Sequence, residues 1–76
     1  MKKIKLPNLG EGIEEAKVSF WYFSEGDSVN KGDDLVELIT DKATFNVPAP
    51  ASGVVKKILH LEGATVKVGD ILAELK

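Results

Sequence analysis

The sequence predicts an all-β fold: a flattened eight-stranded barrel or sandwich of two four-stranded sheets with internal pseudo-twofold symmetry. Three observations favour it. No segment shows sustained helical periodicity, β-branched and aromatic residues gather in short runs bounded by Gly, Pro, Asn and Asp, and part of the sequence repeats. The 76 residues are enough for one domain, residues 1–76, with a small core and no large cleft.

The repeat relates residues 25–38 to residues 62–75 at a separation of 37 residues. Eight of these fourteen positions are identical without a gap, which indicates two copies of one supersecondary unit. Leu6-Pro7 resembles Val47-Pro48 if the first copy carries four extra residues, and these would fall within Asn8–Glu15. We therefore expect two interlocked halves.

Each copy is expected to supply four strands, separated by residues that favour turns. The expected strands are Lys3–Leu6, Ala16–Phe23, Ser28–Val29, Leu35–Thr40, Ala43–Val47, Val54–Leu59, Thr65–Val66 and Ile71–Leu75. One spacing departs from simple alternation, because Leu35 and Leu38 are three residues apart, as are Leu72 and Leu75. Either those strands are covered on both faces or each carries a β-bulge.

A tight hairpin is expected around Lys42. Only here are two strand-like segments, Leu35–Thr40 and Ala43–Val47, separated by just two residues, Asp41-Lys42. The Lys42 amine would then stand at an exposed tip, where another protein can reach and modify it. The equivalent point of the second copy is the C-terminal Lys76, so a twofold places both termini at the end opposite to Lys42.

Composition excludes several functions. The chain has no cysteine, so disulfides and thiolate metal sites are excluded, and no metal site is predicted. A net charge of −2 without any arginine gives no basic surface for nucleic acid. The apolar runs are too short to span a bilayer, so we expect a soluble domain that does not bind membranes.

Acidic residues are concentrated before the Lys42 turn. They are Glu11, Glu14, Glu15, Glu25, Asp27, Asp33, Asp34 and Glu37. Such a run is typical of a solvated face, and alternatively it presents an acidic patch to a basic partner. Four of the five aromatic residues lie in Phe20–Phe23, and because successive strand residues alternate faces, one aromatic pair is expected to be partly exposed. His60 receives no functional role.

Several segments together resemble the lipoyl domains of 2-oxo acid dehydrogenase complexes, in particular those of the dihydrolipoamide acyltransferase component. The segments are Leu9-Gly10-Glu11-Gly12-Ile13-Glu14-Glu15, Gly26-Asp27-Ser28-Val29, Thr40-Asp41-Lys42-Ala43-Thr44, Gly53-Val54-Val55 and Val68-Gly69. The resemblance runs from about Ile4 to Leu75. Its most specific part is Asp-Lys-Ala at the hairpin tip.

The resemblance implies that lipoate is attached through an amide to Lys42 as a swinging arm, which carries acyl groups and electrons. Asp41 and Ala43 flank this lysine for recognition by the ligase, and Gly26 and Gly53 are structural glycines. The related biotin carrier domains resemble Met-Lys-Met at this turn, so Asp41 and Ala43 favour lipoate. The alternatives are a biotin carrier and an unmodified β-sandwich interaction module.

The resemblance also implies partners. These are the 2-oxo acid decarboxylase, the acyltransferase core, dihydrolipoamide dehydrogenase, and a lipoate ligase or lipoyl transferase. The loop formed by Gly10, Glu11, Gly12, Ile13, Glu14 and Glu15 would lie beside the lipoyl-lysine and help the decarboxylase recognise its domain. The loop sequence favours pyruvate or branched-chain complexes. We expect a monomeric, non-catalytic domain in the bacterial cytoplasm, or in the mitochondrial matrix if it is an excised eukaryotic domain.

Overall fold

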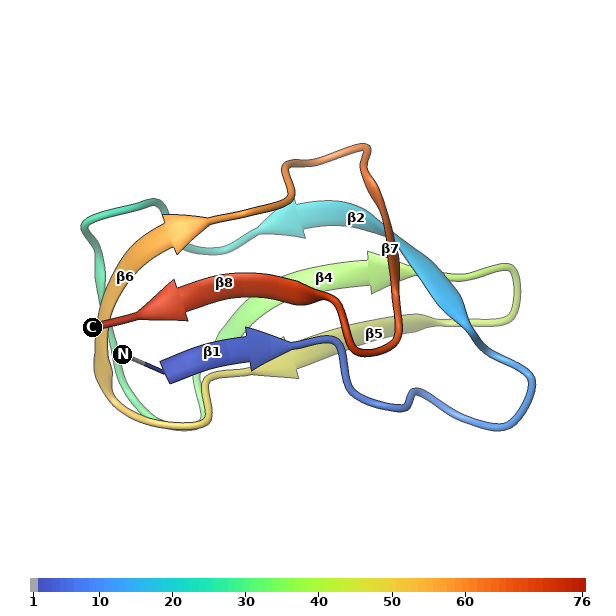
Figure 1. Cartoon of the computed structure of the whole chain (residues 1–76), viewed down its shortest axis with the longest axis horizontal. Helices are drawn as coiled ribbons and strands as arrows, with labels where there is room; N and C mark the ends of the chain where they lie inside the picture. Colours follow the sequence, from blue (N-terminus) through green and yellow to red (C-terminus); the bar gives the residue numbers. More distant parts are fainter. Residues whose placement is uncertain (1) are drawn as a thin grey trace.

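The computed structural model describes residues 2–76, in which all regular structure is β-strand (Figure 1). The strands are β1 (Lys2–Lys5), β2 (Glu15–Trp21), β3 (Ser28–Val29), β4 (Asp34–Ile39), β5 (Thr44–Pro48), β6 (Gly53–Ile58), β7 (Thr65–Lys67) and β8 (Ile71–Leu75). All eight expected strands are present, two of them with the expected bounds and the others with ends that differ by at most two residues. Across this range, no helix is long and apolar enough to cross a membrane.

The strands form two four-stranded antiparallel sheets that pack face to face. One sheet has the order β1-β8-β6-β3 and the other the order β5-β4-β2-β7. Each sheet takes two strands from the first copy of the repeat and two from the second, so the halves interlock as predicted. The result is elongated, with extents of 32 × 20 × 17 Å, and Figure 1 shows the two sheets as front and rear layers.

Backbone hydrogen bonds confirm the pseudo-twofold. The Gly26 N–H donates to the Val55 carbonyl oxygen at 2.7 Å, and the Gly63 N–H donates to the Val18 carbonyl oxygen at the same distance. These two bonds exchange under a shift of 37 residues, because Gly63 is the counterpart of Gly26 and Val55 that of Val18. Each copy therefore completes its hydrogen bonding on the other.

The beginning of the repeat aligns differently from the sequence-based expectation. The Leu6 N–H donates to the Asp70 carbonyl, and the Ala49 N–H makes the equivalent bond to Asp33. Leu6 therefore corresponds to Ala49 rather than to Val47. That separation is 43 residues (49 − 6), so the first copy carries six extra residues (43 − 37) instead of four. They lie in the connection between β1 and β2, where there is no strand pattern from which to align the two copies of the repeat.

The unusual leucine spacing comes from β-bulges. Asp34 pairs with Pro48 but Val36 pairs with Val47, so Leu35 is an extra residue on β4. Leu72 is an extra residue on β8 in the same way. A bulge lets two residues that are three apart face the same side. This is why all four repeat leucines are buried without the sheets being covered on both faces.

The core lies between the two sheets and is made almost entirely of repeated positions. Its largest fully buried side chains are Leu6, Leu35, Leu38, Leu72, Val18, Val36, Val55 and Val66. Burying a side chain of this kind stabilises a fold by roughly 1.5–3 kcal/mol. Trp21 is also buried, and its indole N–H donates to the His60 carbonyl at 2.8 Å. Among residues 2–76 no polar or charged residue is buried.

Candidate functional site

Lys42 lies at the tip of the hairpin that joins β4 to β5. Strand β5 begins at Thr44 rather than at Ala43, but the Thr40 N–H still donates to the Ala43 carbonyl at 2.8 Å. Pairing therefore continues one residue past the strands and leaves Asp41 and Lys42 as the two tip residues. Both are exposed. The expected two-residue connection is confirmed.

The Thr40 hydroxyl holds this turn together. It accepts hydrogen bonds from the N–H groups of Lys42, at 3.2 Å, and Ala43, at 3.0 Å, and it donates to the Ala43 carbonyl at 2.9 Å. No residue other than glycine has a positive φ between residues 2 and 76, so Asp41 and Lys42 make the turn without left-handed strain. The lysine backbone is therefore fixed, and its side chain is exposed.

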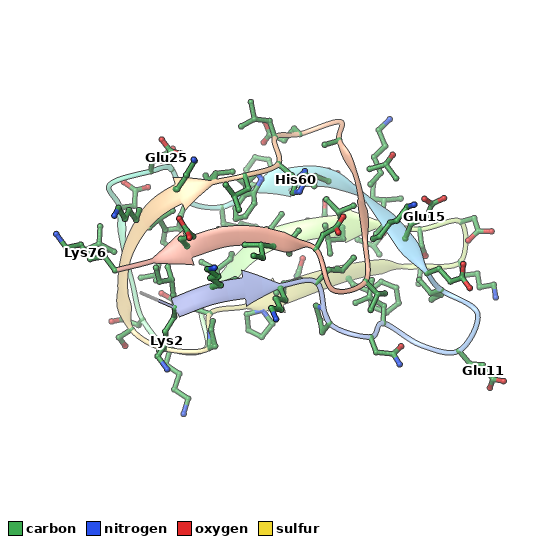
Figure 2. The ribbon with its side chains drawn as sticks, in the orientation of Figure 1. Lys2, Glu11, Glu15, Glu25, His60 and Lys76 are labelled. Carbon is green, nitrogen blue, oxygen red and sulfur yellow. The ribbon has the colours of Figure 1, made fainter. Side chains whose placement is uncertain are left out.

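The hairpin tip and the chain ends lie at opposite ends of the long axis. In Figure 1 the turn between β4 and β5 is at one end, and the termini are at the other. Figure 2 shows the same separation in side chains, with Glu11 of the β1–β2 loop at one end and Lys2 and Lys76 at the other. The molecule can therefore be held at one end while it presents Lys42 at the other.

The β1–β2 loop comes up against Lys42. Gly12 has a φ of +80°, and a Cβ atom added to it would lie 3.2 Å from the Lys42 Nζ. The loop is held by bonds from the Gly10 N–H to the Asn8 Oδ1 at 3.0 Å and from the Ile13 N–H to the Gly10 carbonyl at 3.2 Å. The structure thus brings Lys42 together with the predicted recognition loop.

An open groove of about 890 Å³ lies beside the hairpin. Its lining residues are Gly12, Ile13, Glu14, Glu15, Ala16, Lys17, Ile39, Thr40, Asp41, Thr65 and Lys67. Five of the six predicted recognition residues are exposed, three of them glutamates (Glu11, Glu14 and Glu15), and only Ile13 is half-buried. The site is therefore a shallow acidic surface around an amine rather than an enclosed active site.

The two predicted structural glycines lie away from the hairpin, each with its own physical reason. Gly26 has a φ of +94°, which side chains rarely adopt, although a Cβ atom there would meet nothing within 4 Å. Gly53 has no positive φ, but a Cβ atom on it would lie 2.6 Å from the carbonyl oxygen of Lys76. One glycine is required for backbone conformation and the other for space.

Sequence reasoning missed the role of Thr40, which was named only as the last residue of a strand and the first residue of the hairpin motif. The available signal was a hydroxyl residue at the start of a two-residue turn, where Ser and Thr side chains often bond the backbone two or three residues ahead. The resemblance implied that the loop lies beside Lys42, and Gly12 does lie there. The residues alone gave no signal for this contact, because no local pattern relates residues 30 positions apart (42 − 12).

The fold and this site define a class: a small β-sandwich carrier-type domain with one accessible lysine on a rigid hairpin. Comparison with known proteins gives the family. The family model described as "Biotin-requiring enzyme", which represents the biotin/lipoyl family, matches residues 2–75, and the chain belongs to that family.

Similar proteins include dihydrolipoyllysine-residue acyltransferase components of two kinds. The dihydrolipoyllysine-residue succinyltransferase component of the 2-oxoglutarate dehydrogenase complex from Rickettsia conorii is 45% identical over 73 residues. The dihydrolipoyllysine-residue acetyltransferase component of the pyruvate dehydrogenase complex from Staphylococcus epidermidis is 36% identical over the same length. Each match covers 96% of this chain but only 18% and 17% of the relative, so the chain spans less than a fifth of these proteins.

Solved structures agree on the fold. The lipoyl domain of the 2-oxoglutarate dehydrogenase complex from Azotobacter vinelandii superposes with a TM-score of 0.80 and 34% identity, covering 100% of this chain and 96% of that one. The urea carboxylase of Kluyveromyces lactis contains a similar region, with a TM-score of 0.75 and 29% identity over 100% of this chain and 7% of that one. The resemblance to lipoyl domains is thus confirmed for fold and family.

Proposed function

We propose that this chain is a lipoylated swinging-arm carrier domain of a 2-oxo acid dehydrogenase complex, with lipoate joined through an amide to Lys42. One observation carries the proposal. The Lys42 amine is exposed at the tip of a hairpin that Thr40 holds rigid, at the end of the molecule remote from the termini. Membership of the biotin/lipoyl family supports it.

The residues present fit such a group. A primary amine forms an amide with a carboxylic acid, and the loss of its charge leaves a long flexible arm that begins at a fixed point. Bound lipoate would supply a dithiolane that accepts acyl groups and electrons. The chain itself would position the arm. It has no cysteine, so none of its own thiols would compete in thiol–disulfide exchange.

Partner choice is assigned to the surface around the tip. The decarboxylase would recognise the loop of residues 10–15, which lies against Lys42 through Gly12. The acyltransferase core and dihydrolipoamide dehydrogenase would receive the acyl group and the electrons. The loop sequence favours the pyruvate or branched-chain type, whereas the relatives include the 2-oxoglutarate type at 45% identity and the pyruvate type at 36%. Both are retained as candidates for the 2-oxo acid.

Lipoate is favoured over biotin by the residues that flank the lysine. Biotin carrier domains resemble Met-Lys-Met at this turn, whereas this chain has Asp41 and Ala43 in place of the two methionines. The biotin carrier is kept as the second candidate, because the matching family model is described by biotin and a carboxylase contains the same fold. An unmodified interaction module gives no reason for the amine to occupy the tip.

Intact-mass measurement separates these candidates. The chain is expressed once with lipoate ligase and lipoate and once with biotin ligase and biotin. One added lipoyl group is expected in the first sample and no adduct in the second. One biotin in the second sample without a lipoyl group in the first would favour the biotin carrier, and no adduct in either would favour the unmodified module.

Two lysine substitutions provide the controls. Lys42→Arg is expected to abolish the adduct while changing the free energy of unfolding by no more than about 0.5 kcal/mol, since an exposed turn side chain makes little packing. Lys31→Arg makes the same change at another exposed lysine and should leave the adduct intact. Retention of the lipoyl group in Lys42→Arg would contradict the assignment of the site.

A further inference from the structure

An exposed aromatic pair lies on the outer face of the sheet β5-β4-β2-β7. Phe20 is in β2, Tyr22 directly follows this strand, and the buried Trp21 lies between them. Phe20 is 49% exposed and Tyr22 is 44% exposed. Their ring centroids are 5.1 Å apart with an interplanar angle of 86°, an edge-to-face contact. Large aromatic side chains on an open sheet surface indicate a contact surface more often than single exposed aliphatic residues do.

Acidic groups surround this pair. Phe20 lies directly opposite Glu37 of β4, so both side chains stand on the same face. The Tyr22 hydroxyl donates to the Asn46 Oδ1, and the Asn46 Nδ2 donates to the Asp34 Oδ2, both at 3.4 Å. The rings are thus tied into a surface that carries two carboxylates. We call Phe20, Tyr22, Asp34, Glu37 and Asn46 the aromatic–acidic face.

One basic residue of β2 lies on the hairpin side of this face. Lys17 of β2 pairs with Ile39 of β4. Phe20 pairs with Glu37 on the same two strands, farther from the Lys42 tip. The lysine therefore stands at the edge of the aromatic–acidic face rather than within it.

The pseudo-twofold shows that the fold does not require these rings. The counterparts of Phe20 and Tyr22, 37 residues later, are Lys57 and Leu59 on and after β6. The same strand geometry is therefore built in the second copy with one lysine and one leucine. A purely structural need for two aromatic rings would apply to both copies. The presence of the rings in only one copy therefore indicates a functional role.

We propose that the aromatic–acidic face is a docking site for a cationic segment of a partner protein, which places arginine or lysine side chains against Phe20 and Tyr22. Cations are attracted to aromatic faces, and the carboxylates of Glu37 and Asp34 pair with the same charges. Charge complementarity therefore selects a basic occupant. The site is distinct from the Lys42 tip and does not depend on its modification.

The test uses the unmodified 76-residue chain and a hexa-arginine peptide, with hexa-glutamate as the negative probe. Amide and aromatic NMR shifts are followed during titration at low and high salt. The expected result is saturable shifts at Phe20, Tyr22 and Glu37 that weaken as salt rises. Shifts centred on Glu11, Glu14 and Asp41 instead would overturn the proposal, because the peptide would then bind the acidic surface around the Lys42 tip.

Two variants separate the rings from the charge. Tyr22→Leu installs the residue that stands at the equivalent position of the second copy, keeps the net charge, and is expected to weaken the apparent peptide affinity about fivefold. Glu37→Gln removes one charge and is expected to weaken it about threefold. Its matched control is Glu74→Gln, because Glu74 is the repeat counterpart of Glu37 on the opposite sheet and should leave affinity unchanged.

Two further outcomes count against the site. Equal weakening by Glu37→Gln and Glu74→Gln would mean that the peptide responds only to net charge. Concentration-dependent shifts of Phe20 and Tyr22 without peptide would assign the face to a second copy of this chain, whose opposite sheet carries Lys3, Lys56 and Lys57. Failure of Lys42 to accept lipoate would leave this proposal unaffected.

Discussion

At the scale of single residues, the hairpin depends on Thr40 as much as on the lysine it presents. One hydroxyl accepts from two N–H groups of the turn and donates to the Ala43 carbonyl. Thr40→Val keeps the shape and removes all three bonds. We expect the free energy of unfolding to fall by about 0.5–1 kcal/mol, because the site is partly solvated, and the rate of lipoylation under limiting ligase to fall as the tip loosens.

The control for Thr40→Val is Thr44→Val, which makes the same change at an exposed position of β5. Valine is at least as favourable as threonine in a strand, so stability and lipoylation rate should both be retained. Urea unfolding and timed intact-mass measurements compare the two variants. If both slow lipoylation equally, the Thr40 hydroxyl has no special part in presenting Lys42.

Gly12 offers a second residue-scale prediction. Gly12→Ala forces alanine into a φ of +80° and sets its Cβ atom 3.2 Å from the Lys42 Nζ. Gly63→Ala imposes a similar strain at φ +94° with no neighbour within 4 Å. Both should lower the free energy of unfolding by about 1–2 kcal/mol. Only Gly12→Ala is expected to shift the Lys42 side-chain NMR signals, and equal shifts in both would contradict the contact.

At the scale of elements, two glutamates fasten each half of the molecule to the other. The Glu62 Oε2 accepts from the Trp21 N–H at 3.2 Å, and the Glu25 Oε2 accepts from the Ile58 N–H at 2.8 Å. The two bonds are exchanged by the pseudo-twofold. This explains why the repeat retains glutamate at both positions, next to the glycines that reverse the chain.

The Glu62 bond can be tested by truncation. Glu62→Ala leaves the Trp21 N–H, which is partly buried, without its side-chain acceptor, and we expect the free energy of unfolding to fall by about 1–2 kcal/mol. Glu62→Gln keeps an acceptor oxygen and should cost less than half of that. Denaturant unfolding measures both variants against Glu11→Ala on the exposed loop. Equal stability of all three would show that the bond contributes nothing measurable.

The elements also show which parts of the fold can be predicted from the sequence. The repeat and the turn residues predicted all eight strands and the hairpin tip, because β-structure punctuated by Gly, Pro and Asp has local signals. The sequence left two explanations for the leucine spacing, β-bulges at Leu35 and Leu72 or strands covered on both faces, because a spacing of three residues is compatible with both. The correspondence of Leu6 with Ala49 in the repeat was missed, because only hydrogen bonding between strands fixes it.

The site was predictable in part for the same reason. Lys42 could be placed because its turn is local in sequence. The packing of Gly12 against it was expected only from the family resemblance, because that contact joins two connections that are brought together by the fold and not by any local pattern. The aromatic pair of β2 was expected to be partly exposed, and Phe20 and Tyr22 are. The sequence did not show that Asp34 and Glu37 stand on the same face.

At the scale of the whole molecule, the domain separates a stabilising end from a presenting end. The C-terminal residue completes the sheet beside β6, where the Lys76 N–H donates to the Val54 carbonyl at 2.8 Å and the Val54 N–H returns a bond at 3.2 Å. The Lys42 tip lies at the other end of a molecule 32 Å long. A disturbance at one end should therefore leave the other intact as long as the core remains folded.

Gly53→Ala tests this separation. The new Cβ atom would lie 2.6 Å from the Lys76 carbonyl oxygen, so the C-terminal pairing has to open. We expect the free energy of unfolding to fall by about 1–2 kcal/mol, with faster amide hydrogen exchange at Lys76. The lipoylation rate of the folded protein should not change, because the Thr40 turn is untouched. A slower lipoylation rate in fully folded Gly53→Ala would mean that the two ends are coupled. The end that carries the termini and the end that presents Lys42 would then not act independently.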